Sequence, residues 1–373
     1  MKIAILTGGA CALPPEAIGA VEILWYDIGR ILASRGHSVV MVGKGSENIV
    51  RDGPNFVCKV YPGFNPSARS CGRVWQAFWA CVKMLRMIDD SDVLVSNNVW
   101  GAVLAPLLIR RKYRALVVNV QRMPKAFFSF FNFFADMLAC PSTPVATAAV
   151  RKMGEGWRNR VVVIPNPINV ESFNPEVSRR VRIPQLIVYH GRVNREKGLH
   201  ILAKAVSVLA ARYSGLKLKI VGAYDVAHGG SGDQYKKELD LLSGGRIEWH
   251  SPISNRELLA DELSEGQLYC YPSIAERGET FGVSPLEAMG LGLPTVVSAL
   301  DCFKDFVEDG KSGLVFDHNS ENPAEILANK LDQLLSNEEM RDRIGKAGAM
   351  VAAEFSNVNV ANKYEELFDG FLK

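Results

Sequence analysis

Two carboxylates, Glu279 and Glu287, stand eight positions apart around an expected strand-to-helix turn. Gly282 lies between them, where the backbone can come close to a ligand, and a helix is expected to begin near Ser284. Free N–H groups at a helix start favour an anion, and a carboxylate accepts hydrogen bonds from hydroxyl groups. We therefore expect that Glu287 can bind a vicinal diol and that Glu279 can hold sugar hydroxyls.

The same residues allow an interpretation without a ligand. Ser284-Pro285-Leu286-Glu287 fits a capping box with proline at the first helical position, in which Glu287 only caps its own helix. Periodicity alone favours the cap.

A second group of charged residues follows an apolar segment at residues 186–190. His190-Gly191-Arg192 and Glu196-Lys197-Gly198 place two cations five positions apart in one loop. Arg192 and Lys197 together can neutralise a diphosphate, which a single side chain cannot balance. The alternative is an exposed charged loop, the commoner fate of such residues, although the two bracketing glycines favour a binding role.

Other familiar binding motifs are incomplete. The first loop, from Gly8 to Gly19, is too long and wrongly spaced for Gly-x-Gly-x-x-Gly, which disfavours a nicotinamide enzyme. Gly310-Lys311-Ser312 ends like a phosphate-binding P-loop, but Asp305 occupies the position of the required first glycine. Asp90-Ser91-Asp92 is better explained as the end of a helix than as a metal pair, and no Cys-x-x-Cys pair is present. We predict no metal site and no cofactor.

The composition is that of an ordinary soluble α/β protein. The chain has 373 residues, 48% hydrophobic and 22% charged, so two domains are expected. No apolar run reaches the roughly 18 residues of a membrane-spanning helix, and the start lacks a signal-peptide core. Seven cysteines without framework spacing favour reduced thiols and a cytoplasmic location. The first 180 residues carry 22 basic and 12 acidic side chains and the rest 21 and 28, which suggests an anionic partner for the first half.

Short β-branched segments alternate with segments of helical period, the pattern of parallel sheets wound with helices. Strands are expected at residues 2–7, 38–42, 92–96, 115–120, 137–140, 161–164, 186–190, 216–221, 246–249, 268–271, 295–297 and 314–316. The polar, proline-bearing stretch at residues 166–184 breaks both periods and marks the join. We predict two Rossmann-like doubly wound α/β domains, residues 1–177 and 178–356, facing across a cleft that collects the carboxyl ends of their strands.

In their order and spacing, these motifs resemble the retaining glycosyltransferases of family 4, which have the two-domain GT-B fold. The resemblance covers nearly the whole chain. It is carried by Arg192, Lys197, Glu279 and Glu287 and by the following segments: Pro14-Pro15 to Glu22, Arg35-Gly36-His37, Val163-Ile164-Pro165-Asn166, Gly292-Leu293-Pro294, Glu308-Asp309-Gly310 and Ser312-Gly313-Leu314. It favours the binding role of Glu287 over the cap.

The resemblance implies roles for single residues. Arg192 and Lys197 would hold the pyrophosphate of a nucleotide-sugar donor, and Glu287 its ribose hydroxyls. Glu279 would contact the donor sugar together with the backbone of Phe281, Gly282 and Val283, and Gly19 would lie against the phosphates and the acceptor. The first domain would bind the acceptor and the second the donor, no metal would be needed, and the final helix, residues 357–373, would cross back onto the first domain.

Gln121 departs from the family pattern, because many relatives carry a histidine near the reacting sugar at this position. Glutamine exchanges hydrogen bonds but cannot take a proton, so a contact of Gln121 with the sugar or acceptor would be positional. Pro167 also stands where glycine is usual, which implies a stiffer linker.

The resemblance implies retaining transfer to a glycan or lipid-linked acceptor in cell-surface polysaccharide or glycolipid synthesis. The departing nucleotide diphosphate, stabilised by Arg192, Lys197 and the helix start, would help to remove the acceptor proton. A nucleotide-sugar epimerase or phosphorylase of the same fold stays an alternative, and Gln121 keeps open a non-catalytic sugar-binding subunit. No nucleic-acid-binding module is recognisable, so nucleic acid is not an expected partner.

Residues 127–134 hold six phenylalanines directly after Lys125 and Ala126. This segment has two interpretations. We favour a core helix packed between sheets, because aromatic stripes are usually interior. The other is an apolar, cationic face that makes peripheral contact with an anionic membrane or holds a lipid-linked acceptor.

Overall fold

The computed structural model describes residues 1–9, 11–15, 19–46, 49–63, 70–176 and 180–373. The chain forms two compact units, Met1–Pro167 with Asn357–Lys373, and Ile168–Ser356. This division falls inside the stretch 166–184 where the sequence placed the join. Residues 16–18 of the first loop and the predicted boundary between residues 177 and 178 lie outside the described residues.

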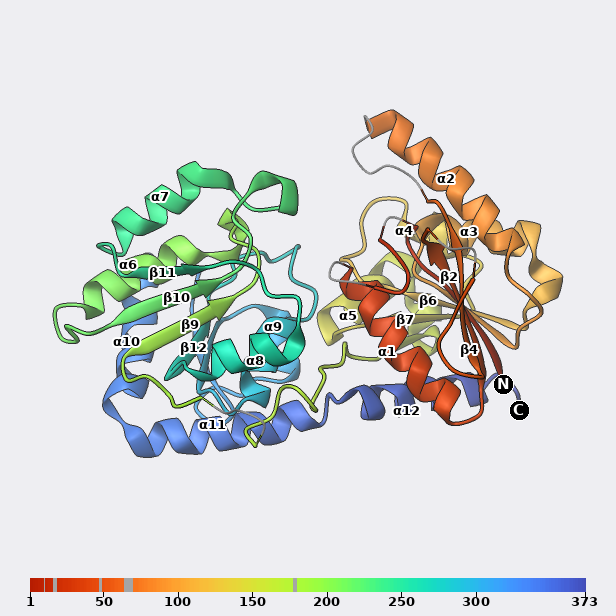
Figure 1. The fold of residues 1–373 in the computed structure, drawn as a ribbon. Helices are drawn as coiled ribbons and strands as arrows, with labels where there is room; N and C mark the ends of the chain where they lie inside the picture. Colours follow the sequence, from red (N-terminus) through yellow and green to blue (C-terminus); the bar gives the residue numbers. More distant parts are fainter. Residues whose placement is uncertain (10, 16–18, 47–48, 64–69, 177–179) are drawn as a thin grey trace. The chain divides into compact units, whose positions relative to one another are not determined.

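The first unit is built on one sheet with the strand order β3-β4-β2-β1-β5-β6-β7-β8 (Figure 1). All neighbours pair in parallel except β3, which is antiparallel to β4. Its strands are β1 (Lys2–Leu6), β2 (Ser38–Lys44), β3 (Ile49–Arg51), β4 (Phe56–Tyr61), β5 (Val93–Ser96), β6 (Ala115–Asn119), β7 (Met137–Cys140) and β8 (Val161–Val163). Its helices are α1 (Ala20–Ser34), α2 (Ser70–Arg86), α3 (Val99–Leu108), α4 (Phe128–Asn132), α5 (Thr143–Met153) and α12 (Asn357–Asp369), with the 3-10 turns η1 (Arg110–Lys112) and η2 (Glu155–Arg160).

Helices cover both faces of this sheet. On one face α1 and α12 pack together, with the rings of Trp25 and Tyr364 4.6 Å apart. The apolar stripe that predicted α1 is confirmed, because Leu24, Trp25, Ile28 and Leu32 are buried and the helix ends just before Gly36, whose φ is +90°. The other face is covered by α2, α3 and α5.

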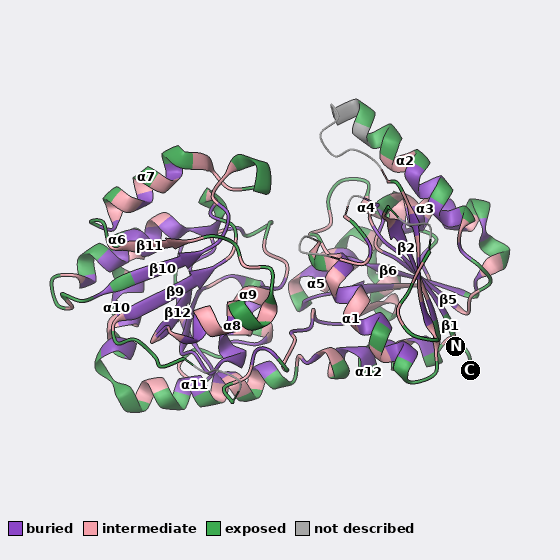
Figure 2. Ribbon diagram, viewed as in Figure 1, coloured by how far each residue is buried: buried purple, intermediate pink, exposed green. Residues whose placement is uncertain are grey.

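The second unit is an all-parallel sheet with the order β11-β10-β9-β12-β13-β14. Its strands are β9 (Leu186–His190), β10 (Lys217–Val221), β11 (Ile247–His250), β12 (Leu268–Tyr271), β13 (Thr295–Ser298) and β14 (Leu314–Phe316). Its helices are α6 (Leu199–Leu209), α7 (Gly232–Leu242), α8 (Arg256–Ser264), α9 (Val283–Gly290), α10 (Pro323–Ser336) and α11 (Glu338–Ala353), with the 3-10 turns η3 (Arg195–Lys197), η4 (Val226–His228) and η5 (Asp301–Asp305). Figure 2 shows the central strands of both sheets buried beneath helices with exposed outer faces, whereas the edge strands β3, β8 and β11 have no buried residue.

The predicted fold class, two doubly wound α/β units, is confirmed, and each of the twelve predicted strands is present. Two strands were missed, β3 and β4. The residues of β4 alternate between buried and half-buried along Phe56–Tyr61, but Lys59 is the one charged residue in this run, so the sequence itself shows no period-two alternation. These two strands extend the sheet beyond β2. Strand β4 is parallel to β2, and the short strand β3, which is antiparallel to β4, forms the edge of the sheet.

The phenylalanine-rich segment is not a core helix, and the favoured prediction for it was wrong. Helix α4 has only five residues, with Asn132 buried, while Phe127, Phe130, Phe133 and Phe134 are 75%, 67%, 65% and 49% exposed. An element of one and a half turns has too little surface to bury six large rings. No helix in the described ranges combines the length and the apolar character needed to cross a bilayer.

Candidate functional site

In the second unit the strand order turns at β9 and β12, which lie side by side at the centre of the sheet. From β9 the chain builds outward to β10 and β11, and it then returns to β12 on the other side. In an open parallel sheet such a switch point forms a crevice at the carboxyl ends of the strands. The two loops that leave this edge carry the charged residues that the sequence singled out.

Glycines bring these loops together. A Cβ on Gly198, whose φ is +67°, would lie 2.0 Å from the carbonyl oxygen of Pro272, at the end of β12. A Cβ on Gly222, after β10, would lie 1.9 Å from the carbonyl oxygen of Gly191. No other residue type fits such contacts, so the glycines around the basic loop allow the backbones after β9, β10 and β12 to touch.

Lys197 and Glu279 form a buried ion pair between the two loops. The Lys197 ammonium donates to Glu279 Oε2 at 2.6 Å, and the two side chains are 9% and 11% exposed. The Lys197 nitrogen also lies 5.2 Å from the centre of the Tyr271 ring, and the Tyr271 hydroxyl donates to Glu279 at 3.2 Å. Because an ammonium carries three N–H groups, Lys197 can donate to a ligand as well as to Glu279.

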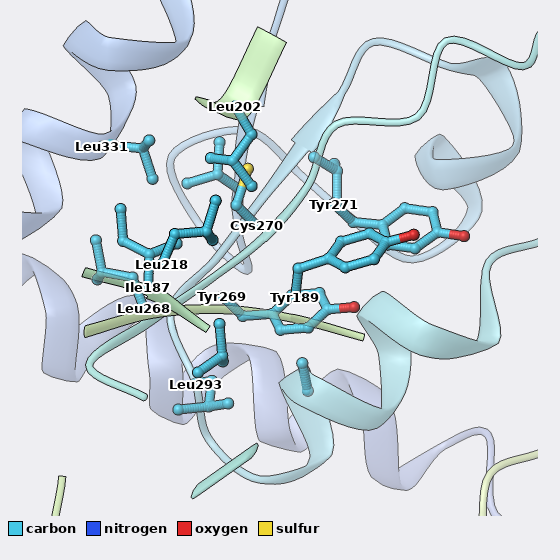
Figure 3. Packing of buried hydrophobic residues seen from close by; sticks show 14 of the residues in the cluster. Ile187, Tyr189, Leu202, Leu218, Leu268, Tyr269, Cys270, Tyr271, Leu293 and Leu331 are labelled. Atoms are coloured by element: carbon cyan, nitrogen blue, oxygen red, sulfur yellow. The ribbon is translucent and has the colours of Figure 1, made fainter. Parts of the chain in front are cut away.

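Two stacked tyrosines support this corner of the site. The rings of Tyr189 on β9 and Tyr271 on β12 are 5.6 Å apart and 14° from parallel, and Figure 3 shows their hydroxyls on the same side. Tyr189 donates to the backbone carbonyl of Arg192 at 3.0 Å, as Tyr271 does to Glu279. Burial raises the pKa of both phenols well above the ordinary value of 10, so both hydroxyls stay protonated and donate.

His190, at the end of β9, and Glu287, on α9, form a second link. His190 Nε2 lies 2.8 Å from Glu287 Oε2, and since a carboxylate only accepts, the proton of this bond sits on Nε2. Their side chains are 7% and 18% exposed. The capping-box interpretation was therefore wrong: the N-cap of α9 is Gly282, no side chain caps the helix, and Glu287 turns to the histidine.

Gly282 shapes the turn into α9. Its φ is +104°, and a Cβ there would lie 2.5 Å from the Phe303 ring. Phe281 is buried against Phe306 and Phe355, so only its backbone is available to a ligand, while Val283 is half-buried at the first turn of α9. The turn presents the N–H groups of a helix start next to the carboxylates, which suits an anion bearing hydroxyl groups.

Arg192 lies on the same loop but has a different environment. Its side chain is 56% exposed, and the carboxylate paired with it, that of Glu196, is 3.8 Å away, beyond an ordinary hydrogen bond. The structure thus brings Arg192, Lys197, Glu279 and Glu287 to one edge of one sheet. One cation is buried and already paired, and the other extends toward solvent.

Gly19 and Gln121 belong to the first unit, after β1 and β6. Gly19 is the N-cap of α1 with a φ of +122°, and a Cβ there would lie 2.7 Å from a carboxylate oxygen of Glu22. The Gln121 amide exchanges two hydrogen bonds with the Asn166 amide, at 2.8 and 3.0 Å, and donates to Asn119 at 3.0 Å. This network fixes the orientation of Gln121.

Three of these partners were not predicted. His190, Tyr271 and Asn119 each end a strand whose residues are all buried. A polar side chain at the carboxyl end of a buried parallel strand was the signal that could have found them, since that edge carries the site in such folds. Glu22 is a fourth: it is buried, and desolvation raises its pKa despite a hydrogen bond from the Gly8 backbone.

A separate hollow of about 1000 Å³ opens on the second unit. It lies between α6, the loop before Gly278 and the start of α10, and its lining includes His200, Lys204 and His318. The four predicted charged residues are not among those that line it. Within the described residues no group of three or more His, Cys, Asp or Glu side chains is placed to hold a metal ion.

Two doubly wound units, the second with paired charged side chains at its switch point, are the architecture of the GT-B glycosyltransferases, and solved structures share this fold. Sucrose-phosphate synthase from Thermosynechococcus elongatus matches with a TM-score of 0.80 at 18% identity, over 100% of this chain and 99% of that one. HepE from Anabaena, solved in complex with UDP and glucose, matches with a TM-score of 0.74 at 18% identity, over 99% and 100%.

Sequence comparison gives the family. Residues 21–172 match the model of Glycosyltransferase Family 4, and residues 171–350 match that of Glycosyl transferases group 1. A phosphatidyl-myo-inositol mannosyltransferase from Mycobacterium leprae is 27% identical over 97% of this chain and 96% of its own length. The chain belongs to the family 4 glycosyltransferases, as its motifs predicted, and it is a glycosyltransferase.

Proposed function

We propose that the enzyme moves a sugar from a nucleotide-diphosphate sugar to a glycan or lipid-linked acceptor, with retention of anomeric configuration. The observation that carries the proposal is a pair of links: Lys197, in the loop after β9, binds Glu279 in the loop after β12, and His190, at the end of β9, binds Glu287 on α9. They place the Lys197 ammonium and the His190 ring N–H beside two carboxylates, so a cation for a phosphate group and acceptors for hydroxyl groups lie together.

Each charged residue has a separate task in this proposal. Arg192, on an exposed and adaptable side chain, and Lys197, held in place by Glu279, bind the diphosphate together with the N–H groups at the start of α9. Glu287 accepts hydrogen bonds from the ribose diol, with His190 holding one of its oxygens. Glu279 and the backbone around Gly282 hold the sugar. Gly19 is assigned to the phosphates and the acceptor, and Gln121 to the sugar or the acceptor.

The reaction needs stabilisation of the negative charge that develops on the departing diphosphate. The bond from the sugar C1 to the diphosphate oxygen breaks, and a bond from C1 to the acceptor oxygen forms on the same face. The acceptor proton passes to a phosphate oxygen, whose developing charge Arg192 and Lys197 stabilise, usually the largest catalytic contribution. Because these two cations and the helix start supply that charge, we propose that transfer needs no bound metal, so turnover is expected to be unchanged in EDTA.

Two named relatives support an acceptor attached to a lipid or a polyol. One is the phosphatidyl-myo-inositol mannosyltransferase, and the other is D-inositol 3-phosphate glycosyltransferase from Corynebacterium urealyticum, 28% identical over 63% of this chain and 56% of its own. Both names contain inositol, which carries a lipid in the first name and a phosphate group in the second, so the first is consistent with the lipid-linked alternative.

Thermal unfolding with nucleoside diphosphates tests the donor site. A ligand that binds only the folded protein stabilises it by about 2.7 kcal/mol at 100 times its Kd. We expect UDP or GDP to raise the melting temperature with concentration, and Arg192→Ala to reduce the shift. If no nucleoside diphosphate has an effect, the donor assignment fails. NMR of the product then tests retention, since an inverted anomeric carbon would contradict the proposed mechanism.

A further inference from the structure

An aromatic surface covers the outer side of three helices in the first unit. Rings from α2, α3 and α4 touch in a continuous series: Trp75 with Phe78, Phe78 with Trp79 and Trp100, Trp100 with Phe131, and Phe131 with Phe130, at centroid distances of 5.2 to 5.9 Å. Its inner rings Phe78 and Trp100 are half-buried against the core, and Phe131 is half-buried beside Trp100. We call this set, with Phe127, Phe133 and Phe134, the aromatic face.

The outer rings of the aromatic face are open to solvent. Trp75 and Trp79 on α2 are 60% and 57% exposed, and Phe127 and Phe130 at α4 are 75% and 67% exposed. Leu107 at the end of α3 is 67% exposed. Single exposed apolar residues are ordinary, but a connected group of this size on one side of a domain marks an interaction surface.

The charges around the aromatic face have one sign. Residues 53–88 and 93–135, which include α2, α3 and α4, contain no aspartate or glutamate and eleven lysines or arginines. On α2, Lys83 and Arg86 continue the stripe of Trp75 and Trp79 at helical spacing. Exposed Lys125 precedes Phe127, and exposed Arg110 and Arg111 follow Leu107.

These cations are free to meet an external anion. Within the described residues, Arg86, Arg111, Arg122 and Lys125 are exposed and have no carboxylate partner. The first unit carries 22 basic and 13 acidic side chains and the second 21 and 27, so the excess positive charge belongs to the unit with the aromatic face. A protein partner would need one strongly acidic and apolar patch of matching shape. A bilayer with anionic lipids offers both properties without a fixed shape, since Trp, Phe and Leu enter its interface and Lys and Arg meet its headgroups.

We propose that the aromatic face docks the enzyme on an anionic lipid bilayer, with the rings in the headgroup region and the surrounding cations on the lipid phosphates. The inference stands on the first unit alone and does not depend on the donor site of the second. Docking would hold the first unit, the proposed acceptor domain, at the surface where a lipid-linked acceptor is presented.

Flotation with vesicles of phosphatidylcholine alone, or mixed with phosphatidylglycerol, tests the proposal on the full chain. The wild type is expected to bind the mixed vesicles at low salt and to bind more weakly in 1 M salt, where screening acts within about 3 Å. Trp79→Ser with Phe130→Ser is expected to lower partitioning on the order of tenfold or more, because two interfacial rings are lost. Arg111→Gln with Lys125→Gln should lower it roughly 30-fold on anionic vesicles, about fivefold per cation.

The matched control is Val226→Ser with Leu241→Ser, which removes two apolar side chains, 74% and 85% exposed, from the second unit. This variant should bind vesicles like the wild type. All variants should keep their melting temperature and their response to nucleoside diphosphate, which separates a failure of docking from a failure of the donor site. No retention of the wild type, equal binding to neutral vesicles, or full binding by the Trp79 and Phe130 variant would overturn the proposal. So would a dimer that the same variant converts to a monomer in the absence of lipid, because a second copy of the chain would then cover the face.

Discussion

Replacing Lys197 by methionine separates the structural from the catalytic role of the buried pair. The 2.6 Å bond to Glu279 and side-chain exposures of 9% and 11% mean that Lys197→Met leaves a buried carboxylate without its cation. Breaking such a pair costs about 3 to 5 kcal/mol. We expect that loss in the free energy of unfolding of the second unit, measured in urea, and a fall in kcat on the order of 10² or more in protein that remains folded.

The second unit provides a matched control for the stability effect. Lys219 on β10 is also buried, with a side-chain exposure of 4%, and its ammonium pairs with Glu262 at 2.7 Å and with Glu265. Lys219→Met should therefore lose similar stability, while its kcat per folded molecule stays near that of the wild type.

A double variant completes the test. Lys197→Met with Glu279→Leu replaces the pair by apolar groups, which is often neutral for stability, so most of the lost free energy of unfolding should return. Activity should not return, because both ligand contacts are gone. If folded Lys197→Met turns over within a few-fold of the wild type, or the double variant recovers activity along with stability, the pair is structural and the proposed role of Lys197 is wrong.

Three further predictions follow from single contacts. Arg192→Ala should change the free energy of unfolding by less than about 0.5 kcal/mol, since the side chain is 56% exposed. The same change should lower kcat by a factor on the order of 10². A variant that loses stability and keeps its activity would contradict this role. Glu287→Gln should raise the donor KM about tenfold or more with a smaller effect on kcat, because a ribose contact is made before and during transfer; an unchanged KM would remove Glu287 from the donor site. Glu365 on α12 pairs with His37 at 2.6 Å and with Arg35, and these bonds hold its pKa below the ordinary 4.5. A carboxyl group whose pKa is lowered by folding stabilises the folded state at pH values above its pKa in the unfolded chain. This stabilisation is lost as the pH falls through the lowered pKa of the folded state. Glu365→Gln should therefore cost about 1 kcal/mol at pH 7, and the difference in stability from the wild type should shrink below pH 4.5. A difference that is constant across this range in urea titrations would refute the assignment.

The sequence predicted the fold well because the central strands of the second unit, β9, β12 and β13, are buried along their whole length. Segments such as Leu186–His190 and Leu268–Tyr271 are short apolar runs with turns on both sides, a pattern that helices wound on a parallel sheet require. The site loops were predictable for a related reason: glycines at 191, 198 and 282 mark places where a backbone must approach closely or take a positive φ.

The sequence could not predict which side chains meet across loops. The spacing of Ser284 and Glu287 fits a helix cap as well as a ligand site. The choice depends on His190, 97 residues away in the chain, because its ring nitrogen binds the Glu287 carboxylate. The prediction for the phenylalanine-rich segment, residues 127–134, was wrong for a similar reason. Six phenylalanines indicate an apolar environment, but the choice between core and surface depends on whether α4 is long enough to be covered.

The proposed donor site contains two carboxylates, and a carboxylate beside a phosphate group must be held by a hydrogen-bond donor or a cation. A carboxylate accepts from sugar hydroxyls, but beside a diphosphate it also repels the ligand. Glu279 is therefore held by the permanent cation of Lys197 and by the Tyr271 hydroxyl, while Glu287 is held by an imidazole N–H. A buried ion pair is weak grounds for stability, since apolar residues of similar volume would serve as well. Its position at the switch point, between loops that only glycine allows to touch, is better explained by the need to keep a hydroxyl acceptor next to a phosphate group.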